Sequence, residues 1–406
     1  MKIQMVDLKG QYNKIKPQID EAVGAVMESC AFINGPQVKE FATHLQEYLG
    51  VKHVITCANG TDALQIALMA LDLKKGDEVI LPAFTYVATA EVVALLGLTP
   101  VMVDVDYNTF NITVANIEKA LTPRSKAIVP VHLFGQSCNM EEIMEFAYKH
   151  NLYVIEDNAQ ALGGYSLMQS CDERGEASQK KRCTGTTGHI GCTSFFPSKN
   201  LGCYGDGGAI MTDDDILAQK MAMIANHGQK VKYHHSVIGC NSRLDTIQAA
   251  VLDVKLTHLD QYCKARYDAA AYYTAKLLNF DPDGQYFLTP SEAPYASHVY
   301  HQYTLKVLDN GATYKDANGN RVAVRDALKS YLAENGIPAM VYYPLPLNEQ
   351  EAFDGIAVAA EELKVSKELS GSVLSLPMHT ELTYEMQDFI VDKIKEFFLT
   401  TGENVQ

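Results

Sequence analysis

The sequence has no long apolar run, no apolar leader and no excess of positive charge, and each absence removes a class of function. No stretch of the 406 residues approaches the roughly 20 apolar residues that a membrane-spanning helix needs. Residues 1–7 lack the apolar core of a secretory signal peptide. Acidic residues outnumber basic ones by 49 to 34, and the net charge of −15 argues against general nucleic-acid binding. We therefore expect a cytoplasmic protein without a membrane or nucleic-acid partner.

Metal-binding and disulfide patterns are also missing. The nine cysteines include no Cys-x-x-Cys pair, and the sequence has no His-Glu-x-x-His motif, so we expect no metal. An odd number of scattered cysteines suits free thiols in a reducing compartment better than a disulfide framework. Cys183, Cys192 and Cys203 are interpreted as small buried residues, and an iron–sulfur site from dispersed cysteines stays open as the alternative.

What the sequence does contain is an alternation of helical and strand patterns. This order predicts an α/β fold in which a large domain has a mixed, mostly parallel sheet between helices. The length allows two domains, and we place the large domain at residues 1–255 and a smaller α+β domain at 256–406. The first residues are expected to pack on the smaller domain. Helices are predicted over 17–29, 36–49, 140–150, 260–278 and 384–400, and strands near 51–57, 101–105, 152–156 and 208–212.

Residues 166–182 interrupt this alternation. The segment is polar and mixes aspartate, glutamate, glycine, glutamine and lysine. We predict a surface loop there, and we favour an inert insertion over a lid.

Lys199 is the most informative residue of the chain. It lies between an apolar run and a glycine-rich loop, whereas solvated lysines usually lie on polar helix faces. A buried amine with a lowered pKa can form a Schiff base with an aldehyde cofactor. The position of Lys199 therefore predicts pyridoxal phosphate (PLP) as the cofactor.

The sequence also contains a candidate site for the phosphate of this cofactor. Gly60, Thr61 and Asp62 follow a strand and open a helix, where free backbone amides bind anions and the Thr61 hydroxyl adds a donor. An ordinary helix cap explains this motif equally well. Ser194, five residues before Lys199, supplies a second hydroxyl.

The cofactor ring needs a carboxylate at its nitrogen, a donor at its phenolic oxygen and a stacking partner. Asp157 ends a strand, where ligands of open α/β sheets gather, and Gln160 follows three residues later. Glu156 competes with Asp157, but strand alternation points it to the other face. Tyr86 suits the stacking role, Phe84 competes with it, and either aromatic residue suits the core as well.

Taken together, these segments resemble the sugar aminotransferases of the DegT/DnrJ/EryC1/StrS family, which have PLP fold type I. The similarity covers nearly the whole chain. The motifs that carry it are Phe32-Ile33-Asn34-Gly35-Pro36, Asn59-Gly60-Thr61-Asp62-Ala63-Leu64, Pro82-Ala83-Phe84-Thr85-Tyr86, Glu156-Asp157-Asn158-Ala159-Gln160-Ala161, Ser194-Phe195-Phe196-Pro197-Ser198-Lys199-Asn200-Leu201, Asn226-His227-Gly228, Gly239-Cys240-Asn241-Ser242-Arg243-Leu244-Asp245 and Tyr342-Tyr343-Pro344.

The resemblance implies the role of each site residue. Lys199 would form the Schiff base and move the proton between cofactor and sugar carbons. Asn241 would reach the phosphate from the neighbouring subunit, so the active unit is expected to be a homodimer. The substrates would be a nucleotide-linked keto-sugar and glutamate, the amino donor. The implied cofactor contacts are Gly60, Thr61, Asp62 through its amide, and Ser194 for the phosphate, and Asp157, Gln160 and Tyr86 for the ring.

One region of the resemblance narrows the substrate. Residues 189–248 look most like enzymes that make 3-amino-3-deoxy-N-acetylglucosaminuronic acid from UDP-2-acetamido-2-deoxy-3-oxo-glucuronate, for lipopolysaccharide or O-antigen sugars. Arg243 would pair with the sugar carboxylate, with the glutamate carboxylate, or only with a surface partner. Tyr342 and Tyr343, which stand where many relatives have His-Tyr, are expected to contact the sugar. A 3- or 4-aminotransferase for a neutral dTDP-, UDP- or GDP-linked keto-sugar is the alternative.

Two other classes of protein resemble this chain less well. Related PLP- or PMP-dependent sugar dehydratases carry histidine in place of the lysine, so Lys199 argues against that reading. A non-enzymatic sensor or regulatory protein with the same fold would be expected to lose cofactor contacts, and none is lost here.

Overall fold

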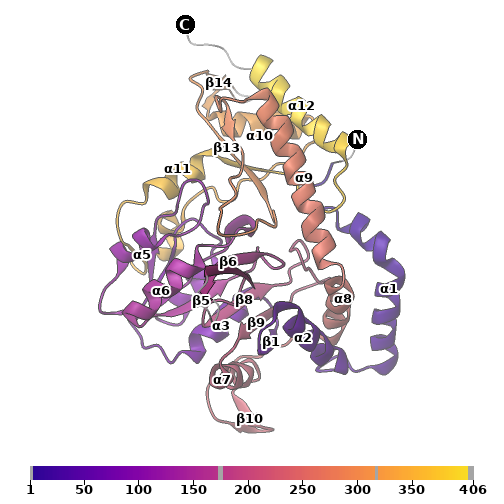
Figure 1. The fold of residues 1–406 in the computed structure, drawn as a ribbon, viewed down its shortest axis with the longest axis vertical. Helices are drawn as coiled ribbons and strands as arrows, with labels where there is room; N and C mark the ends of the chain where they lie inside the picture. Colours follow the sequence, from indigo (N-terminus) through magenta and orange to yellow (C-terminus); the bar gives the residue numbers. More distant parts are fainter. Residues whose placement is uncertain (1–2, 172–176, 316–318, 401–406) are drawn as a thin grey trace.

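The larger part of the molecule is built on an eight-stranded sheet with helices on both faces (Figure 1). The computed structural model describes residues 3–171, 177–315 and 319–400. The strand order is β1-β9-β8-β5-β4-β2-β3-β16, in which β9 runs antiparallel to both neighbours and the remaining pairs are parallel. The prediction of a mixed, mostly parallel sheet is thus confirmed. The strands are β1 (His53–Cys57), β2 (Glu78–Pro82), β3 (Thr99–Val103), β4 (Ser125–Ile128), β5 (Tyr153–Asp157), β8 (Ile190–Ser194), β9 (Gly208–Thr212) and β16 (Val358–Ala359).

Helices cover this sheet because its strands are apolar on both sides. Every residue of β2 and of β9 is buried, and apart from the terminal residues Glu78 and Thr212 these strands are apolar without alternation. One face packs against α3 (Gly60–Ala70), α4 (Ala88–Leu95) and α7 (Asp215–Ala225). The other face packs against α5 (Val114–Ala120), α6 (Met140–His150), α2 (Pro36–Leu49) and α8 (Thr246–Leu256). Among the described residues, no helix is both long and apolar enough to cross a membrane.

The first helix is longer than its sequence pattern predicts. Proline is favoured in the first helical turn, so a helix was expected to start near Pro17. Helix α1 (Leu8–Ser29) instead contains Pro17 in its interior and is capped by Asp7, whose carboxylate accepts from the Gly10 amide at 2.8 Å. Packing of Ile15 and Ile19 on α8 stabilises this longer helix despite the missing proline donor.

The smaller part is built on the three-stranded antiparallel sheet β12-β13-β17. Helix α9 (Leu259–Phe280) leads to it from the end of α8, as Figure 1 shows. Ile3 belongs to its core, and the Met378 amide donates to the Met5 carbonyl, so the first residues pack there. Its elements are β12 (Phe287–Leu288), β13 (Tyr303–Val307), α10 (Val324–Glu334), β17 (Val373–Leu376) and α12 (Tyr384–Thr400).

The chain returns once to the larger sheet after entering the smaller part. Strand β16 pairs with β3, preceded by the short helices η2 (Leu347–Glu349) and η3 (Glu351–Phe353) and followed by α11 (Lys364–Ser372). Leu347, Phe353 and Leu363 belong to one core cluster of the larger sheet. A domain boundary at 255/256 stays a prediction.

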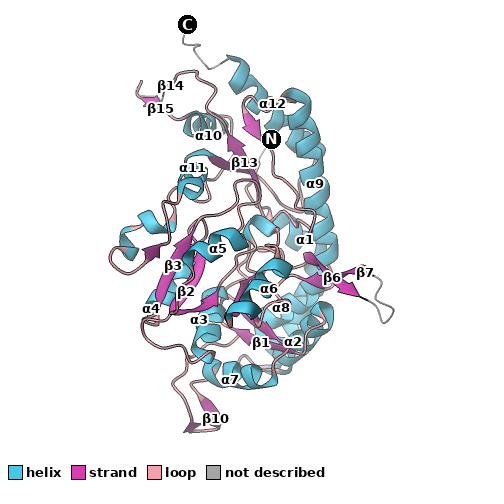
Figure 2. Cartoon of the chain, turned by 60° about the vertical axis from the view of Figure 1, so that its left-hand side comes forward, coloured by secondary structure: helices cyan, strands magenta, loops and turns pink. Residues whose placement is uncertain are grey.

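The predicted surface loop at 166–182 is wrong, because most of this segment forms a hairpin. Strands β6 (Tyr165–Cys171) and β7 (Ala177–Cys183) pair antiparallel at the periphery of the molecule (Figure 2). Polar side chains are compatible with an exposed two-stranded ribbon, so polarity alone was a poor guide to a loop. Residues 172–176 of the segment lie outside the described residues. Two further hairpins are β10–β11 (Gln229–Val231, His234–His235) and β14–β15 (Tyr314–Lys315, Arg321–Val322).

Candidate active site

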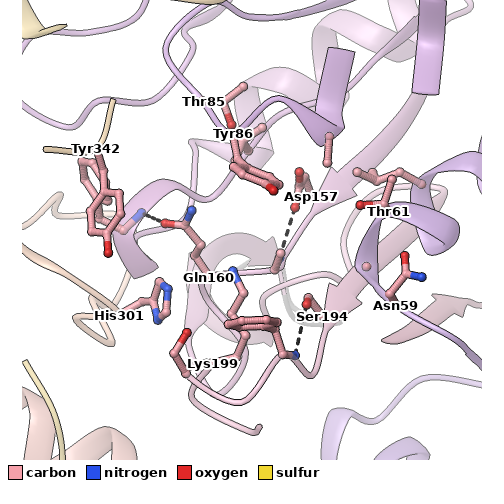
Figure 3. Close-up of a pocket in the computed structure, with 18 of the residues that line it drawn as sticks. Asn59, Thr61, Thr85, Tyr86, Asp157, Gln160, Ser194, Lys199, His301 and Tyr342 are labelled. Atoms are coloured by element: carbon pink, nitrogen blue, oxygen red, sulfur yellow. Dashed lines mark hydrogen bonds between the residues drawn. The ribbon is translucent and has the colours of Figure 1, made fainter. Parts of the chain in front are cut away.

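A cavity of about 660 Å³ lies where β5, β8 and the N-terminus of α3 meet (Figure 3). This is the carboxyl edge of the parallel strands, where open α/β sheets bind ligands. The cavity brings together most of the residues that the sequence singled out. They are Gly60, Thr61, Asp62, Tyr86, Asp157, Gln160, Ser194, Lys199, Tyr342 and Tyr343.

One end of the cavity is a cradle of amides and hydroxyls at the start of α3. The Asn59 side chain caps this helix by accepting from the Asp62 amide at 2.8 Å. A Cβ on Gly60 would lie 2.7 Å from the Ser194 Cβ, so only glycine lets the helix begin this close to Ser194. The first-turn amides of Gly60 and Thr61 have no acceptor within the helix and stay available for an anion. The Asp62 amide, which the resemblance assigns to phosphate, donates to the Asn59 side chain, and its contact with phosphate stays a prediction.

Asp157 ends β5 and faces the cavity from the side of the sheet. Its carboxylate accepts from the Thr89 hydroxyl at 2.8 Å and from the Ala159 amide at 3.2 Å. Burial raises the pKa of Asp157, while these donors and the nearby Lys199 lower it. A buried carboxylate with a raised pKa favours a cationic partner, such as the protonated nitrogen of a pyridine ring.

Glu156 points away from this cavity, as strand alternation predicts. It accepts from the His132 ring at 2.7 Å and from the amides of Gly185, Thr187 and Gly188. The Cys138 amide donates to His132 Nδ1, so the neutral ring donates to Glu156 through Nε2. Although burial favours the protonated carboxyl, these donors hold the pKa of Glu156 below its usual range. Glu156 therefore has partners of its own and does not compete with Asp157.

Lys199 lies on the segment between β8 and β9, and its amine faces the cavity (Figure 3). Burial lowers the pKa of Lys199 to about 8, and Asp157 opposes this shift only in part. An amine with this pKa is partly deprotonated near neutral pH, which a nucleophile or a proton carrier requires.

Gln160 is oriented by two hydrogen bonds on the wall beside Lys199. Its Oε1 accepts from the Phe134 amide at 2.7 Å, and its Nε2 donates to the Tyr343 hydroxyl at 3.3 Å. The amide NH₂ group is thus turned toward Tyr343 and the cavity, where it can also donate to a ligand.

The two aromatic candidates for stacking separate clearly. Phe84 is fully buried and packs on Phe110 and Phe134 in the core. Tyr86 is 56% exposed and lines the cavity. Tyr86 is therefore available to a ligand and Phe84 is not.

These residues fit pyridoxal phosphate by the chemistry of their donors and acceptors. One cavity combines an anion cradle, a buried carboxylate, an exposed aromatic face, an amide donor and an amine of lowered pKa. Thr85 also lines the cavity, and its hydroxyl is buried without a hydrogen-bond partner. Because such a group is costly to leave unpaired, it indicates a polar ligand.

Two predicted site residues lie elsewhere in the same chain. Arg243 lines a second cavity of about 380 Å³, together with Asn34, Lys39 and Asn226. Asn241 is exposed and forms a bridge to Asn226. Neither residue lines the cavity that holds Lys199.

The structure adds residues that sequence reasoning missed. Thr85 lies in the bend before α4 and Thr89 lies in the first turn of that helix, and no sequence pattern singled out either residue. His301 and Gln302 also line the cavity, but no local motif marks them, because they arrive from a segment more than one hundred residues after Lys199. In the described part of the chain, no three His, Cys, Asp or Glu side chains gather as a metal site would need.

Comparison with known proteins gives one consistent family. Residues 13–395 match the DegT/DnrJ/EryC1/StrS aminotransferase family. The chain is 44% identical to a pleiotropic regulatory protein of Geobacillus stearothermophilus, over 98% of this chain and 99% of that one. It is 43% identical to the UDP-2-acetamido-2-deoxy-3-oxo-D-glucuronate aminotransferase of Pseudomonas aeruginosa, over 94% and 96% of the two chains. Among solved structures, it matches a DegT DnrJ EryC1 StrS aminotransferase from Brucella abortus with a TM-score of 0.86 and 39% identity, over 97% and 99% of the chains.

Proposed function

The chain belongs to the DegT/DnrJ/EryC1/StrS aminotransferase family, and from this premise we propose that it moves the amino group of glutamate to C3 of UDP-2-acetamido-2-deoxy-3-oxo-glucuronate. At the coarser level, the chain is a PLP-dependent nucleotide-sugar aminotransferase. The observation that carries the proposal is the meeting of the Lys199 amine and the Asp157 carboxylate in one buried cavity. The product would serve lipopolysaccharide or O-antigen biosynthesis in the cytoplasm.

Each cofactor group has a proposed partner in the cavity. When bound, pyridoxal phosphate supplies an aldehyde that takes up an amino group and a ring that withdraws electrons. The amides of Gly60 and Thr61 and the Ser194 hydroxyl would hold the phosphate, and Asp157 would hold the ring nitrogen. In the same proposal, Tyr86 covers one ring face, Gln160 donates to the phenolic oxygen and Lys199 is the covalent anchor.

Proton movement is assigned to Lys199. Its pKa of about 8 lets the amine accept a proton from a carbon acid and return it near neutral pH. Burial raises the pKa of Asp157, and the donors Thr89 and Ala159 offset this rise only in part, so a protonated ring nitrogen opposite the carboxylate would stabilise its charge. The two groups thus have separate tasks, one that moves a proton and one that holds a fixed charge.

The carboxylates of both proposed substrates need a cation. Lys199 is the only cationic residue among the described ones that line the cavity, and it is needed for the cofactor. We assign the missing cation to Arg243, and an additional phosphate contact to Asn241, both from a second copy of the chain. A homodimer with shared sites is therefore part of the proposal.

The sugar itself is the least constrained element. Tyr342 and Tyr343 line the cavity and are the proposed sugar contacts. The neutral alternative, a 3- or 4-keto sugar on dTDP, UDP or GDP, is favoured by one observation, namely that no arginine lines this cavity among the described residues.

A coupled turnover assay tests the proposal. Purified protein, pyridoxal phosphate and glutamate would receive the 3-oxo-glucuronate, generated in place by its dehydrogenase, and mass spectrometry would read the product. A gain of one amino group with release of 2-oxoglutarate is expected. If only neutral 3- or 4-keto sugars react, the uronate assignment is wrong; if no keto-sugar of this panel accepts the amine, the proposed function is rejected.

A further inference from the structure

His301 is a buried polar residue of the cavity that the proposed mechanism leaves without a task. It lies two residues before β13, is 6% exposed and lines the same cavity as Lys199. Its Nδ1 is buried and has no hydrogen-bond partner. Buried polar atoms in native proteins are nearly always paired, so an unpaired one in a ligand cavity indicates a partner on the ligand.

The backbone around His301 is fixed firmly enough to hold the imidazole in place. The buried Arg266 on α9 donates through Nη1 to the carbonyls of Tyr300, His301 and Met378, at 3.1–3.3 Å. Gly135, with φ +107°, lies so close that an added Cβ would be 2.9 Å from the His301 amide nitrogen. These contacts restrict the segment on two sides, so the ring is presented to the cavity by a rigid support.

The imidazole is neutral in this setting. Burial is the main cause that lowers the pKa of His301 well below its usual range, and the positive charges of Lys199 and Arg266 lower it further. A neutral ring offers one donor and one acceptor. The charged residues that line the cavity are Asp62, Asp157, Asp206 and Lys199, so carboxylates already outnumber the amine. The cavity as a whole therefore suits an uncharged polar group beside the neutral His301 better than another carboxylate.

Position separates His301 from the groups proposed for the cofactor. Figure 3 shows His301 on the side of the cavity with Tyr342, Gln160 and Lys199, away from Asn59 and Thr61 in the anion cradle. The phosphate, the ring nitrogen, the ring face and the phenolic oxygen each have a candidate partner already. His301 is therefore free to contact a reactant that binds beside the cofactor, either glutamate or the keto-sugar.

We propose that His301 is a sugar-contacting residue, whose neutral imidazole forms a hydrogen bond with a hydroxyl or carbonyl group of the nucleotide-linked keto-sugar. This inference rests on the proposed function and specifies it further. It assigns His301 to the uncharged part of the sugar. The carboxylate of a uronate or of glutamate would pair with the cation proposed above, Arg243 of a second copy of the chain.

The test separates the two half-reactions in a His301→Phe variant. Phenylalanine keeps the ring and removes both nitrogens. The half-reaction with glutamate, which is monitored through the loss of the visible absorbance of bound cofactor, should proceed at the wild-type rate. The KM for the keto-sugar that wild-type protein accepts should rise about 10- to 100-fold, because a buried polar group of the sugar is left unpaired. His301→Asn restores a polar atom near Nδ1 and should recover part of this loss.

Stability supplies a readout that does not depend on turnover. Because Nδ1 has no partner in the protein, cofactor-free His301→Phe should unfold at a Tm equal to or above that of wild type. His298, three residues earlier and equally buried, is the matched control, since its Nδ1 accepts from the Tyr300 amide at 3.0 Å. His298→Phe should lower the Tm and leave the KM for the sugar unchanged.

The outcomes keep the two levels of the proposal apart. If wild-type protein fails with glutamate and with every keto-sugar of the panel, the proposed function fails and the role of His301 fails with it. If wild type is active but His301→Phe slows both half-reactions equally, or lowers the Tm as His298→Phe does, then His301 is structural and only this inference is overturned.

Discussion

The two ends of the active-site cavity are built in different ways. At the cradle end, Asn59, Gly60 and Thr61 are consecutive residues at the start of one helix, and the Asn59 side chain already has a partner. At the opposite end, His301 and Tyr342 come from segments about forty residues apart. The buried Nδ1 of His301 has no hydrogen-bond partner.

This difference separates general chemistry from substrate choice. A phosphate is the same in every PLP enzyme, so a contiguous strand–turn–helix motif can hold it with backbone amides. A sugar differs from enzyme to enzyme, and its contacts come from loops that a rigid scaffold positions. We therefore expect changes at the cradle to affect cofactor binding, and changes at the far end to affect which sugar reacts.

Lys199 joins the two ends, so its removal should have the largest effect. Lys199→Ala is expected to lower turnover by about 10³-fold or more, because both the covalent anchor and the proton carrier are lost. Turnover by mass spectrometry and the visible absorbance of bound cofactor would be measured. Activity close to wild type would remove Lys199 from the mechanism.

The cradle alone is tested by Gly60→Ala. The new Cβ would lie 2.7 Å from the Ser194 Cβ, so α3 has to move away from the phosphate position. We expect cofactor affinity to fall about 100-fold, as for loss of two or more charge-assisted hydrogen bonds. Spectroscopic titration of cofactor-free protein measures this. Gly24→Ala in α1, where an added Cβ meets nothing within 4 Å, is the control and should bind cofactor normally.

The substrate end is tested through Arg243. If Arg243 of a second copy holds the sugar carboxylate, Arg243→Ala should reduce kcat/KM for the uronate about 10- to 100-fold and affect its neutral counterpart far less. Mixed dimers of Lys199→Ala and Arg243→Ala should regain activity, because one of the two sites has both residues intact. Equal losses on both sugars, or no recovery in mixed dimers, would contradict the assignment.

A smaller effect is expected for Thr89, which contacts Asp157 and has no proposed contact with the cofactor. Thr89→Val removes the hydroxyl that donates to Asp157 and should raise the pKa of this carboxyl further. Because the ionised form of Asp157 is needed, the acid limb of the profile of kcat/KM against pH should move to higher pH. At pH values on this acid limb, kcat/KM should be about tenfold lower than in wild type. A profile that falls uniformly without moving would mean that Thr89 only supports packing.

The smallest effect concerns the pH at which the cofactor is captured. Since the pKa of Lys199 is lowered to about 8, the rate of capture by cofactor-free protein should rise with pH and level off above about 8. A lysine with the ordinary value of 10.5 would show a continued rise well beyond that point. Stopped-flow absorbance between pH 6.5 and 9.5 distinguishes the two curves.

Much of the fold was predictable because its signals are local. The long helices α6 and α12 begin and end at the predicted residues 140–150 and 384–400, where amphipathic periodicity is sustained. Strand β9 likewise matches 208–212. The errors have identifiable causes: tertiary packing carries α1 through Pro17, and a polar composition concealed the β6–β7 hairpin.

In the candidate site, too, the residues with local sequence signals were predictable and the others were not. Asp157, Gln160 and Ser194 lie at strand ends or just after them, so strand prediction and sequence order sufficed to place them near Lys199. The place of His301 in the site could not be predicted from the sequence, because it depends on contacts with Arg266 and Gly135, which are distant in sequence. The hydrogen bond from the Asp62 amide to the Asn59 side chain was also not predictable, since a motif does not tell which amide a neighbouring side chain accepts from.

The return of the chain to the edge of the large sheet limits how the protein can be dissected. Strand β16 and the residues around it, including Phe353 and Leu363, complete the core of the larger part although they lie between elements of the smaller part in sequence. A gene fragment for residues 256–406 would carry these apolar side chains without the surface that covers them, and a fragment for 1–255 would lack its own edge strand. Expression of either half alone is expected to give aggregated material, whereas the two halves produced together should recombine.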